Sequence, residues 1–176
     1  MSSVILIVAG VAGSGKTTVG TLLAQRLRWR FADADTFHPQ ANIEKMRAGK
    51  PLTDEDRMPW LRAVAAWIDE RIDAGQSAVV TCSCLKRSYR HLLLDGRPAA
   101  IMVFLDVDHD ILRKRVLART DHFFPEKLLQ SQLDTLEQPS PADELDVHVV
   151  TADGDPAETV AAIVTVLWPC GMQGEP

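Results

Sequence analysis

The segment Gly10–Thr17 constrains the fold of this chain more than any other, because a glycine-rich turn joins two apolar segments of different period. It reads Gly-Val-Ala-Gly-Ser-Gly-Lys-Thr and fits the pattern G-x-x-x-x-G-K-[ST]. The preceding run Val4–Ala9 is apolar throughout, which is typical of a strand covered on both faces. The apolar residues that follow have helical spacing: Val19, Leu22, Leu23 and Leu27. This strand–loop–helix context predicts an anion site at a helix N-terminus.

Each residue type in the loop has a chemical reason to be there. The glycines allow a tight turn in which several N–H groups point into one concavity. Lys16 can place its charge on the β- and γ-phosphates, and the Thr17 hydroxyl can bind Mg²⁺. We therefore predict that the loop binds the phosphates of a nucleoside triphosphate; the absence of a guanine-reading motif, described below, favours ATP. The expected nucleotide contacts are Gly10, Val11, Ala12, Gly13, Ser14, Gly15, Lys16, Thr17 and Thr18.

The rest of the chain alternates predicted strands and helices. Further apolar strands are expected at Trp29–Ala32, Ala78–Thr81, Ile101–Leu105 and Val147–Val150. Helices are expected around Leu61–Ile72, Ser88–Leu94, Asp110–Leu117, Glu126–Leu136 and Pro156–Leu167. Such alternation predicts an α/β fold with a mostly parallel sheet and helices on both faces. Ligands of these sheets bind at the carboxyl ends of the strands.

Length and composition limit the other possibilities. At 176 residues with 46% hydrophobic residues, the chain is expected to form one domain over residues 1–168, with a frayed tail at 169–176. A net charge of −5 gives no case for nucleic-acid binding, and no apolar run approaches the length of about 20 residues that spans a membrane. The three cysteines, an odd number without a disulfide framework, favour reduced thiols and a cytoplasmic location.

Two carboxylates follow the predicted second strand. Asp33 and Asp35 are two residues apart, so in an extended segment they would share a face and both point toward the phosphates. One could position Mg²⁺ or accept a proton from an attacking hydroxyl, and the other could bind substrate hydroxyls. The segment Ala78–Cys82 ends without an aspartate, so Asp33 is the natural carboxylate for the metal. Its role as general base or as magnesium ligand stays open.

A basic group follows the third predicted strand. Lys86 and Arg90 are four residues apart, which would put them on one helical face, where they could hold a carboxylate or phosphate together. The alternative is a solvated basic face.

Several segments, taken together, resemble the gluconate kinase (gluconokinase) family of small P-loop kinases. The most specific stretch contains Asp33-Ala-Asp35-Thr-Phe-His38-Pro39, Asn42, Lys45-Met46, Gly49, Pro51-Leu52, Asp54, Asp56-Arg57 and Pro59-Trp60-Leu61. Later matches are Cys82-Ser83-x-Leu85-Lys86-x-x-Tyr89-Arg90, Leu117-x-Arg119-x-x-His122-Phe123-Phe124 and Gln132-Leu-Asp134-Thr-Leu136-Glu137-x-Pro139.

The resemblance implies phosphorylation of D-gluconate on its 6-hydroxyl by ATP and Mg²⁺. It also implies a P-loop kinase fold with a five-stranded parallel sheet, a mobile lid near residues 119–138 and a homodimer. The residues expected to bind substrate are Asp35, His38, Arg57, Lys86, Arg90 and His122. Lid arginines, Arg119 above all and then Arg115, would stabilise charge on the transferred phosphoryl group. Lys16, Asp33 and Arg119 are the expected catalytic residues.

Two alternatives remain. The first is a P-loop kinase of another small anionic acceptor, such as shikimate or a nucleotide. The second is a nucleotide-dependent switch, which would usually read guanine with Asn-Lys-x-Asp. Asn42 is the only asparagine and is followed by Ile43-Glu44-Lys45, so that motif is absent.

Overall fold

The computed structural model describes residues 3–118 and 126–169, and it contains a five-stranded parallel sheet. The strands are β1 (Ile5–Ala9), β2 (Arg30–Asp33), β3 (Ala78–Cys82), β4 (Ala100–Asp106) and β5 (Val147–Thr151), in the order β2-β3-β1-β4-β5. Every strand pairing is parallel. This arrangement confirms the predicted α/β class with the sheet of a P-loop kinase.

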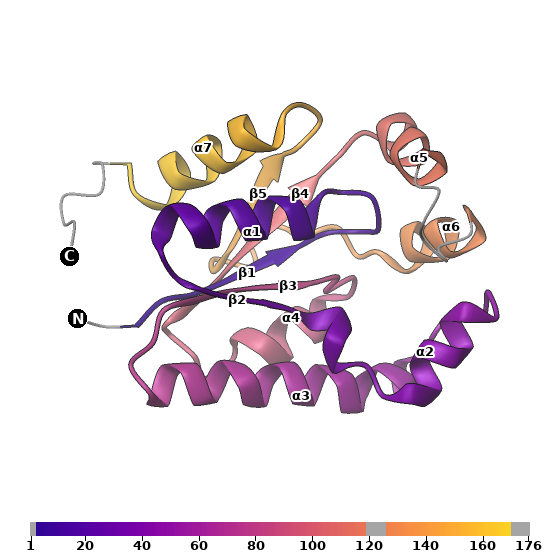
Figure 1. Ribbon diagram of the computed structural model, residues 1–176, viewed down its shortest axis with the longest axis horizontal. Coiled ribbons are helices and arrows are strands. Elements are labelled where there is room, and N and C mark those ends of the chain that lie inside the picture. The colour runs from indigo at the N-terminus through magenta and orange to yellow at the C-terminus, as the bar shows by residue number, and fades with distance from the viewer. Residues whose placement is uncertain (1–2, 119–125, 170–176) are drawn as a thin grey trace.

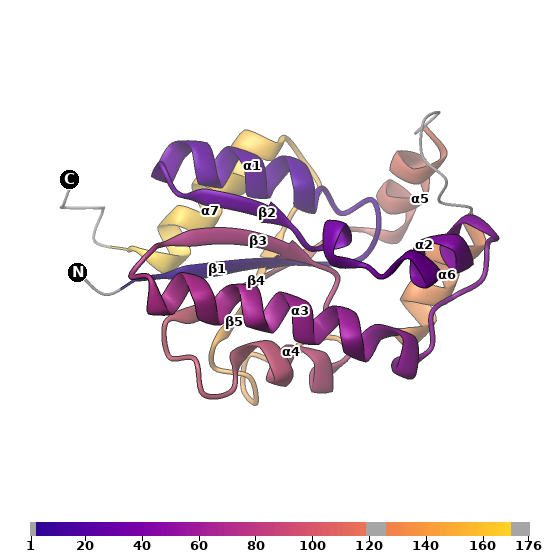
Figure 2. The ribbon, with the colours of Figure 1, turned by 60° about the horizontal axis from the view of Figure 1, so that its bottom comes forward.

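Helices cover both faces of the sheet (Figures 1 and 2). On one face lie α1 (Lys16–Leu27) and α7 (Pro156–Leu167); on the other lie α3 (Asp54–Asp73) and α4 (Arg87–Leu94). At the carboxyl ends of the strands lie α2 (Gln40–Arg47), α5 (His109–Leu117) and α6 (Glu126–Thr135).

The central strand explains the uninterrupted apolar run near the start of the chain. Alternate side chains of β1 belong to two different cores: Ile5 and Ile7 pack with α3, whereas Leu6 and Val8 pack with α1 and α7. All five residues of β1 are fully buried. A strand covered on both faces has no solvent side on which polar residues could alternate.

The segment between β2 and α3 is the main part of the fold that we did not predict. It contains a 3₁₀ turn, η1 (Ala34–Phe37), and the short helix α2. Helix α3 also begins earlier than its apolar stripe indicates, at Asp54, because Thr53 and Asp56 form a capping box that satisfies backbone N–H groups at the helix start. This insertion brings His38 and Arg57 toward the carboxyl edge of the sheet.

Parts of the predicted lid and tail, residues 119–125 and 170–176, lie outside the described residues. Cys82 and Cys84 are buried free thiols. Within the described ranges, no helix combines the length and the apolar character needed to cross a bilayer.

Candidate active site

The loop between β1 and α1 has the backbone shape that an anion site requires. Gly15 forms the N-cap of α1 with a φ of 92°, in the left-handed region that favours glycine. A Cβ at this position would meet no atom within 4 Å, so the loop is open on that side. By contrast, a Cβ at Gly10 would come within 2.7 Å of the Ser14 Oγ, so the base of the loop is closely packed. The result is a tight turn with an open concave side.

Donors gather at this open side because helix α1 begins there. The first N–H groups of a helix, here those of Lys16, Thr17 and Thr18, have no acceptor inside the helix and carry the positive end of its dipole. The Lys16 ammonium donates to the Val11 carbonyl at 3.0 Å and so bridges the loop. These groups can bind the phosphates of a nucleotide.

Asp33 and Asp35 both lie beside the loop, although not in the way that strand alternation predicts. Strand β2 ends at Asp33, and the chain turns into η1 at Ala34, so the expectation of a shared strand face is wrong. Instead, the Asp33 Oδ1 accepts a hydrogen bond from the Asp35 N–H at 3.0 Å. Although Asp35 is partly open to solvent, loss of hydration among the surrounding protein atoms raises the pKa of its carboxyl. The positive charge of Lys16 opposes this rise in pKa, and the negative charge of Asp33 adds to it.

Asp33 also contacts the start of α1. The Thr17 hydroxyl donates to the Asp33 Oδ2 at 3.0 Å. A hydroxyl and a carboxylate beside a phosphate site are oxygen ligands of the kind that Mg²⁺ prefers, since this ion is usually held by one or two carboxylates together with substrate phosphates and water. The two side chains therefore fit the expected metal.

His38 follows the turn η1, and its ring is held there in the neutral form. It stacks on Trp60 with ring centroids 4.2 Å apart, and its Nδ1 lies 3.3 Å from the Asn42 amide nitrogen. Burial and then the charge of Arg57 lower the pKa of His38 to about 4. A neutral imidazole can both donate and accept hydrogen bonds, which suits a hydroxyl group.

Arg57 is buried, with 7% of its surface exposed. Its Nε donates to the Leu52 carbonyl at 3.4 Å, and its guanidinium lies 6.0 Å from the centre of the Tyr89 ring. A positive charge is thus held close to His38 and Tyr89.

Lys86 and Arg90 do not form the expected pair. Lys86 is the extended N-cap residue of α4, so helical spacing does not place it above Arg90. The Lys86 Nζ donates to both carboxylate oxygens of Asp54 at 2.8 Å, and the Tyr89 hydroxyl donates to the same carboxylate.

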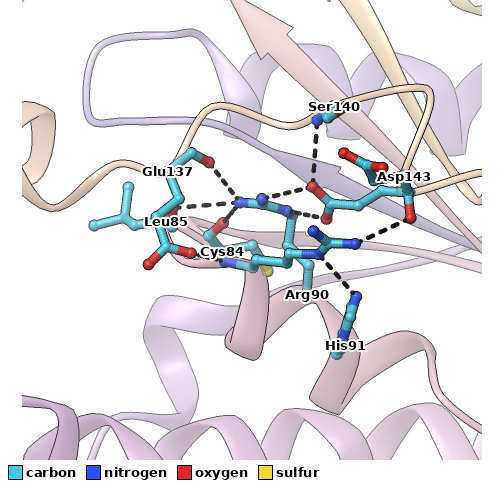
Figure 3. A network of polar contacts seen from close by, with 9 residues as sticks. Cys84, Leu85, Arg90, His91, Glu137, Ser140 and Asp143 are labelled. Carbon is cyan, nitrogen blue, oxygen red and sulfur yellow. Dashed lines mark hydrogen bonds and ion pairs between the residues drawn. The ribbon is translucent and has the colours of Figure 1, made fainter.

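Arg90 is instead fully buried in a structural network (Figure 3). Its guanidinium pairs with Glu144 at 2.6 and 2.9 Å. Its Nη1 donates to three carbonyls, those of Cys84, Leu85 and Glu137. We therefore withdraw Arg90 from the expected substrate contacts, because its donors are used inside the protein.

Of the three remaining predicted residues, the structure describes Arg115, on helix α5. The Arg115 Nη2 donates to the carbonyls of Ala152, Asp153 and Gly154, which follow β5, at 3.0, 2.8 and 3.4 Å. Arg115 thus fixes that loop. Arg119 and His122 lie outside the described residues.

Comparison with known proteins shows which family has this combination of sequence and fold. The family model described as shikimate kinase matches residues 12–168. A gluconokinase of Gluconobacter oxydans is 51% identical over 134 residues, 76% of this chain and 75% of its own length. The thermoresistant gluconokinase of Escherichia coli is 41% identical over 165 residues, 93% of each chain. The chain belongs to the gluconokinase family. The crystal structure of a gluconokinase from Sinorhizobium meliloti superposes with a TM-score of 0.79 at 39% identity, covering 95% of this chain and 97% of that one.

One contact of this gluconokinase-family site was missed by sequence reasoning. The Gln132 side-chain oxygen on α6 accepts the Ala12 N–H at 2.7 Å. Gln132 occurs in a segment that resembles the family, but 120 positions separate the two partners, and no local pattern predicts such a contact.

Proposed function

We propose that this protein transfers the γ-phosphoryl group of ATP to the 6-hydroxyl of D-gluconate, giving 6-phospho-D-gluconate and ADP. The observation that carries the proposal is the contact of a phosphate loop with Asp33, which is hydrogen-bonded to Asp35, in a chain 41% identical to a gluconokinase over 93% of both lengths. Gluconate is a polyol with one carboxylate. Its binding site needs a cation for the carboxylate and groups that donate and accept hydrogen bonds for the hydroxyls.

On the donor side, the N–H groups of the loop and the Lys16 ammonium bind the phosphates. Their charges stabilise the negative charge that spreads over the transferred group. Thr17 and Asp33 would hold Mg²⁺, which neutralises charge on the phosphate oxygens when bound. Arg119 and, less directly, Arg115 are proposed to assist from the segment after β4.

The two carboxylates can be given separate roles. Asp33 contacts Thr17, so we assign it to the metal. Asp35 then takes the proton from the 6-hydroxyl as the oxygen–phosphorus bond forms and the bond to ADP breaks. Asp33→Asn should raise the Mg²⁺ concentration needed for half-maximal rate, whereas Asp35→Asn should lower kcat without changing that concentration. The reverse pattern would exchange the two roles.

For the gluconate side of the site, we assign His38 to a substrate hydroxyl, and Arg57 and Lys86 to the substrate carboxylate. Lys86 is paired with Asp54, whose pKa is lowered first by the hydrogen bond from Lys86 and then by that from Tyr89. The substrate carboxylate would have to share or displace Asp54. His122 is proposed as a further contact.

The decisive experiment is a coupled assay of ADP release with Mg-ATP and a panel of acceptors. We expect turnover with D-gluconate and little with shikimate, nucleoside monophosphates or other sugar acids. Shikimate belongs in the panel because the matching family model carries its name. Turnover with shikimate but not gluconate would overturn the proposal.

We also propose that the protein acts as a cytoplasmic homodimer. The family resemblance supports the dimer, and the buried free thiols Cys82 and Cys84 suit a reducing compartment. Light scattering coupled to size exclusion would test the dimer, and a mass equal to one chain would contradict it.

A further inference from the structure

Gln132 is placed to control the geometry of the phosphate loop. Its Oε1 accepts the Ala12 N–H at 2.7 Å, and it belongs to α6, far along the chain from the loop. We propose that Gln132 is a positioning residue, which holds the loop in its phosphate-binding shape without touching the nucleotide. The proposal rests on the nucleotide-binding part of the proposed function.

The middle of the loop needs such support because its other described bonds to neighbouring segments lie at its two ends. There the Gly10 N–H donates to the Ser83 carbonyl at 3.4 Å, and the Thr17 hydroxyl donates to Asp33 at 3.0 Å. Between these ends the described bonds are internal. The Ser14 N–H donates to the Val11 carbonyl at 3.2 Å, and the Lys16 Nζ donates to the same carbonyl. Neither bond fixes the loop relative to the elements around it. A segment with three glycines has many accessible conformations, so an external hydrogen bond reduces the ordering that phosphate binding would otherwise require.

Helix α6 is itself held firmly enough to act as a support. Leu129 is buried in the same core as Val11, and Leu133 packs against that core. The two leucines therefore fix α6 against the side of the loop that carries Ala12.

The end of α6 is anchored by the buried network of Arg90. Glu137 lies two residues beyond the end of α6, and its N–H donates to the Leu85 carbonyl at 2.9 Å. Arg90 donates to the Glu137 carbonyl at 3.0 Å (Figure 3). Arg90, which we first expected to bind an anion, thus helps to hold the segment that follows α6, the helix that carries Gln132.

The test compares Gln132→Met with Gln130→Met. Methionine keeps the length of the side chain but removes the acceptor. Gln130 is an exposed residue of the same helix, and its amide donates to Asp134, also on α6, at 2.8 Å. Calorimetric titration with Mg-ADP should show about tenfold weaker binding for Gln132→Met and no change for Gln130→Met. The Ala12 amide proton should move upfield in the NMR spectrum of Gln132→Met, while the KM for gluconate and the thermal midpoint stay constant.

Unchanged ADP affinity in Gln132→Met would overturn the proposal, and so would an equal loss in Gln130→Met. If Gln132→Met does not fold, Gln132→Ala serves instead: it removes the acceptor, alanine has a high helix propensity, and under the proposal the variant must also weaken ADP binding. The ADP titration needs no turnover. A wild-type protein that binds ADP but does not phosphorylate gluconate would therefore refute the proposed function and leave this test intact.

Discussion

At the scale of single residues, Lys16 and His38 show how position sets the chemistry of a side chain. Lys16 stands at the first position of α1 and reaches back across the loop to the Val11 carbonyl. His38 stacks on Trp60 near a buried arginine, and this environment keeps its ring uncharged. Each residue therefore supports a prediction of its own.

Lys16→Ala should lower kcat for phosphoryl transfer by about a hundredfold or more, because it removes the positive charge that stabilises the transferred group. Lys114→Ala, at an exposed position on α5, is the matched control and should leave the rate unchanged. The coupled assay measures both. An equal loss in the two variants would mean that overall charge, rather than the loop lysine, matters.

His38 should make folding sensitive to mild acid. Its pKa falls from 6.5 to about 4 on folding, so between these values the unfolded chain binds the proton more readily. The free energy of unfolding should therefore decrease as the pH falls through this range. Asp54 and Asp56 have lowered pKa values, so their stabilising effect is lost only in stronger acid.

Urea unfolding across that pH range, with an NMR titration of the His38 ring, measures this effect. In His38→Gln the decrease should be shallower. A ring that titrates near 6.5 in the folded protein would contradict the prediction.

At the scale of elements, the pair Arg90–Glu144 joins α4 to the segment between α6 and β5. Both side chains are buried, with 1% and 3% of their surface exposed. The Arg90 guanidinium also donates to two carbonyls after β3 and to one after α6. It therefore connects three segments: those after β3, after α6 and before β5. The role of Arg90 is thus in the packing of elements.

Arg90→Met should lower the free energy of unfolding by about 3–5 kcal/mol, because it leaves a buried carboxylate and several carbonyls without partners. Glu144→Gln should cost less, since the amide oxygen still accepts one hydrogen bond. Asp69→Asn removes the negative charge from a half-exposed ion pair with Arg97. It should lower the free energy of unfolding by at most about 1 kcal/mol. Urea denaturation ranks the three variants, and an Arg90→Met variant as stable as Asp69→Asn would contradict this account.

At the scale of the whole molecule, the site is assembled from the exits of β1 and β2 and from the start of α3. Because these segments pack on both cores, ligand binding should stabilise the chain as a whole. At a Mg-ADP concentration of 100 times Kd, the gain should be about 2.7 kcal/mol. Thermal unfolding with and without Mg-ADP measures it, and Lys16→Ala should show a much smaller shift. A wild-type midpoint that does not move would argue against nucleotide binding.

Local patterns in the sequence were enough to predict the phosphate loop, the strands and most helices, because backbone turns and apolar periodicity depend on neighbours a few residues apart. The same patterns failed where the backbone left its regular form. Asp35 lies in a 3₁₀ turn rather than on a strand, and Lys86 is an N-cap rather than a helical residue. Only the tertiary structure could decide that Arg90 faces Glu144 and that Gln132 meets Ala12, because packing brings together residues that are 54 and 120 positions apart.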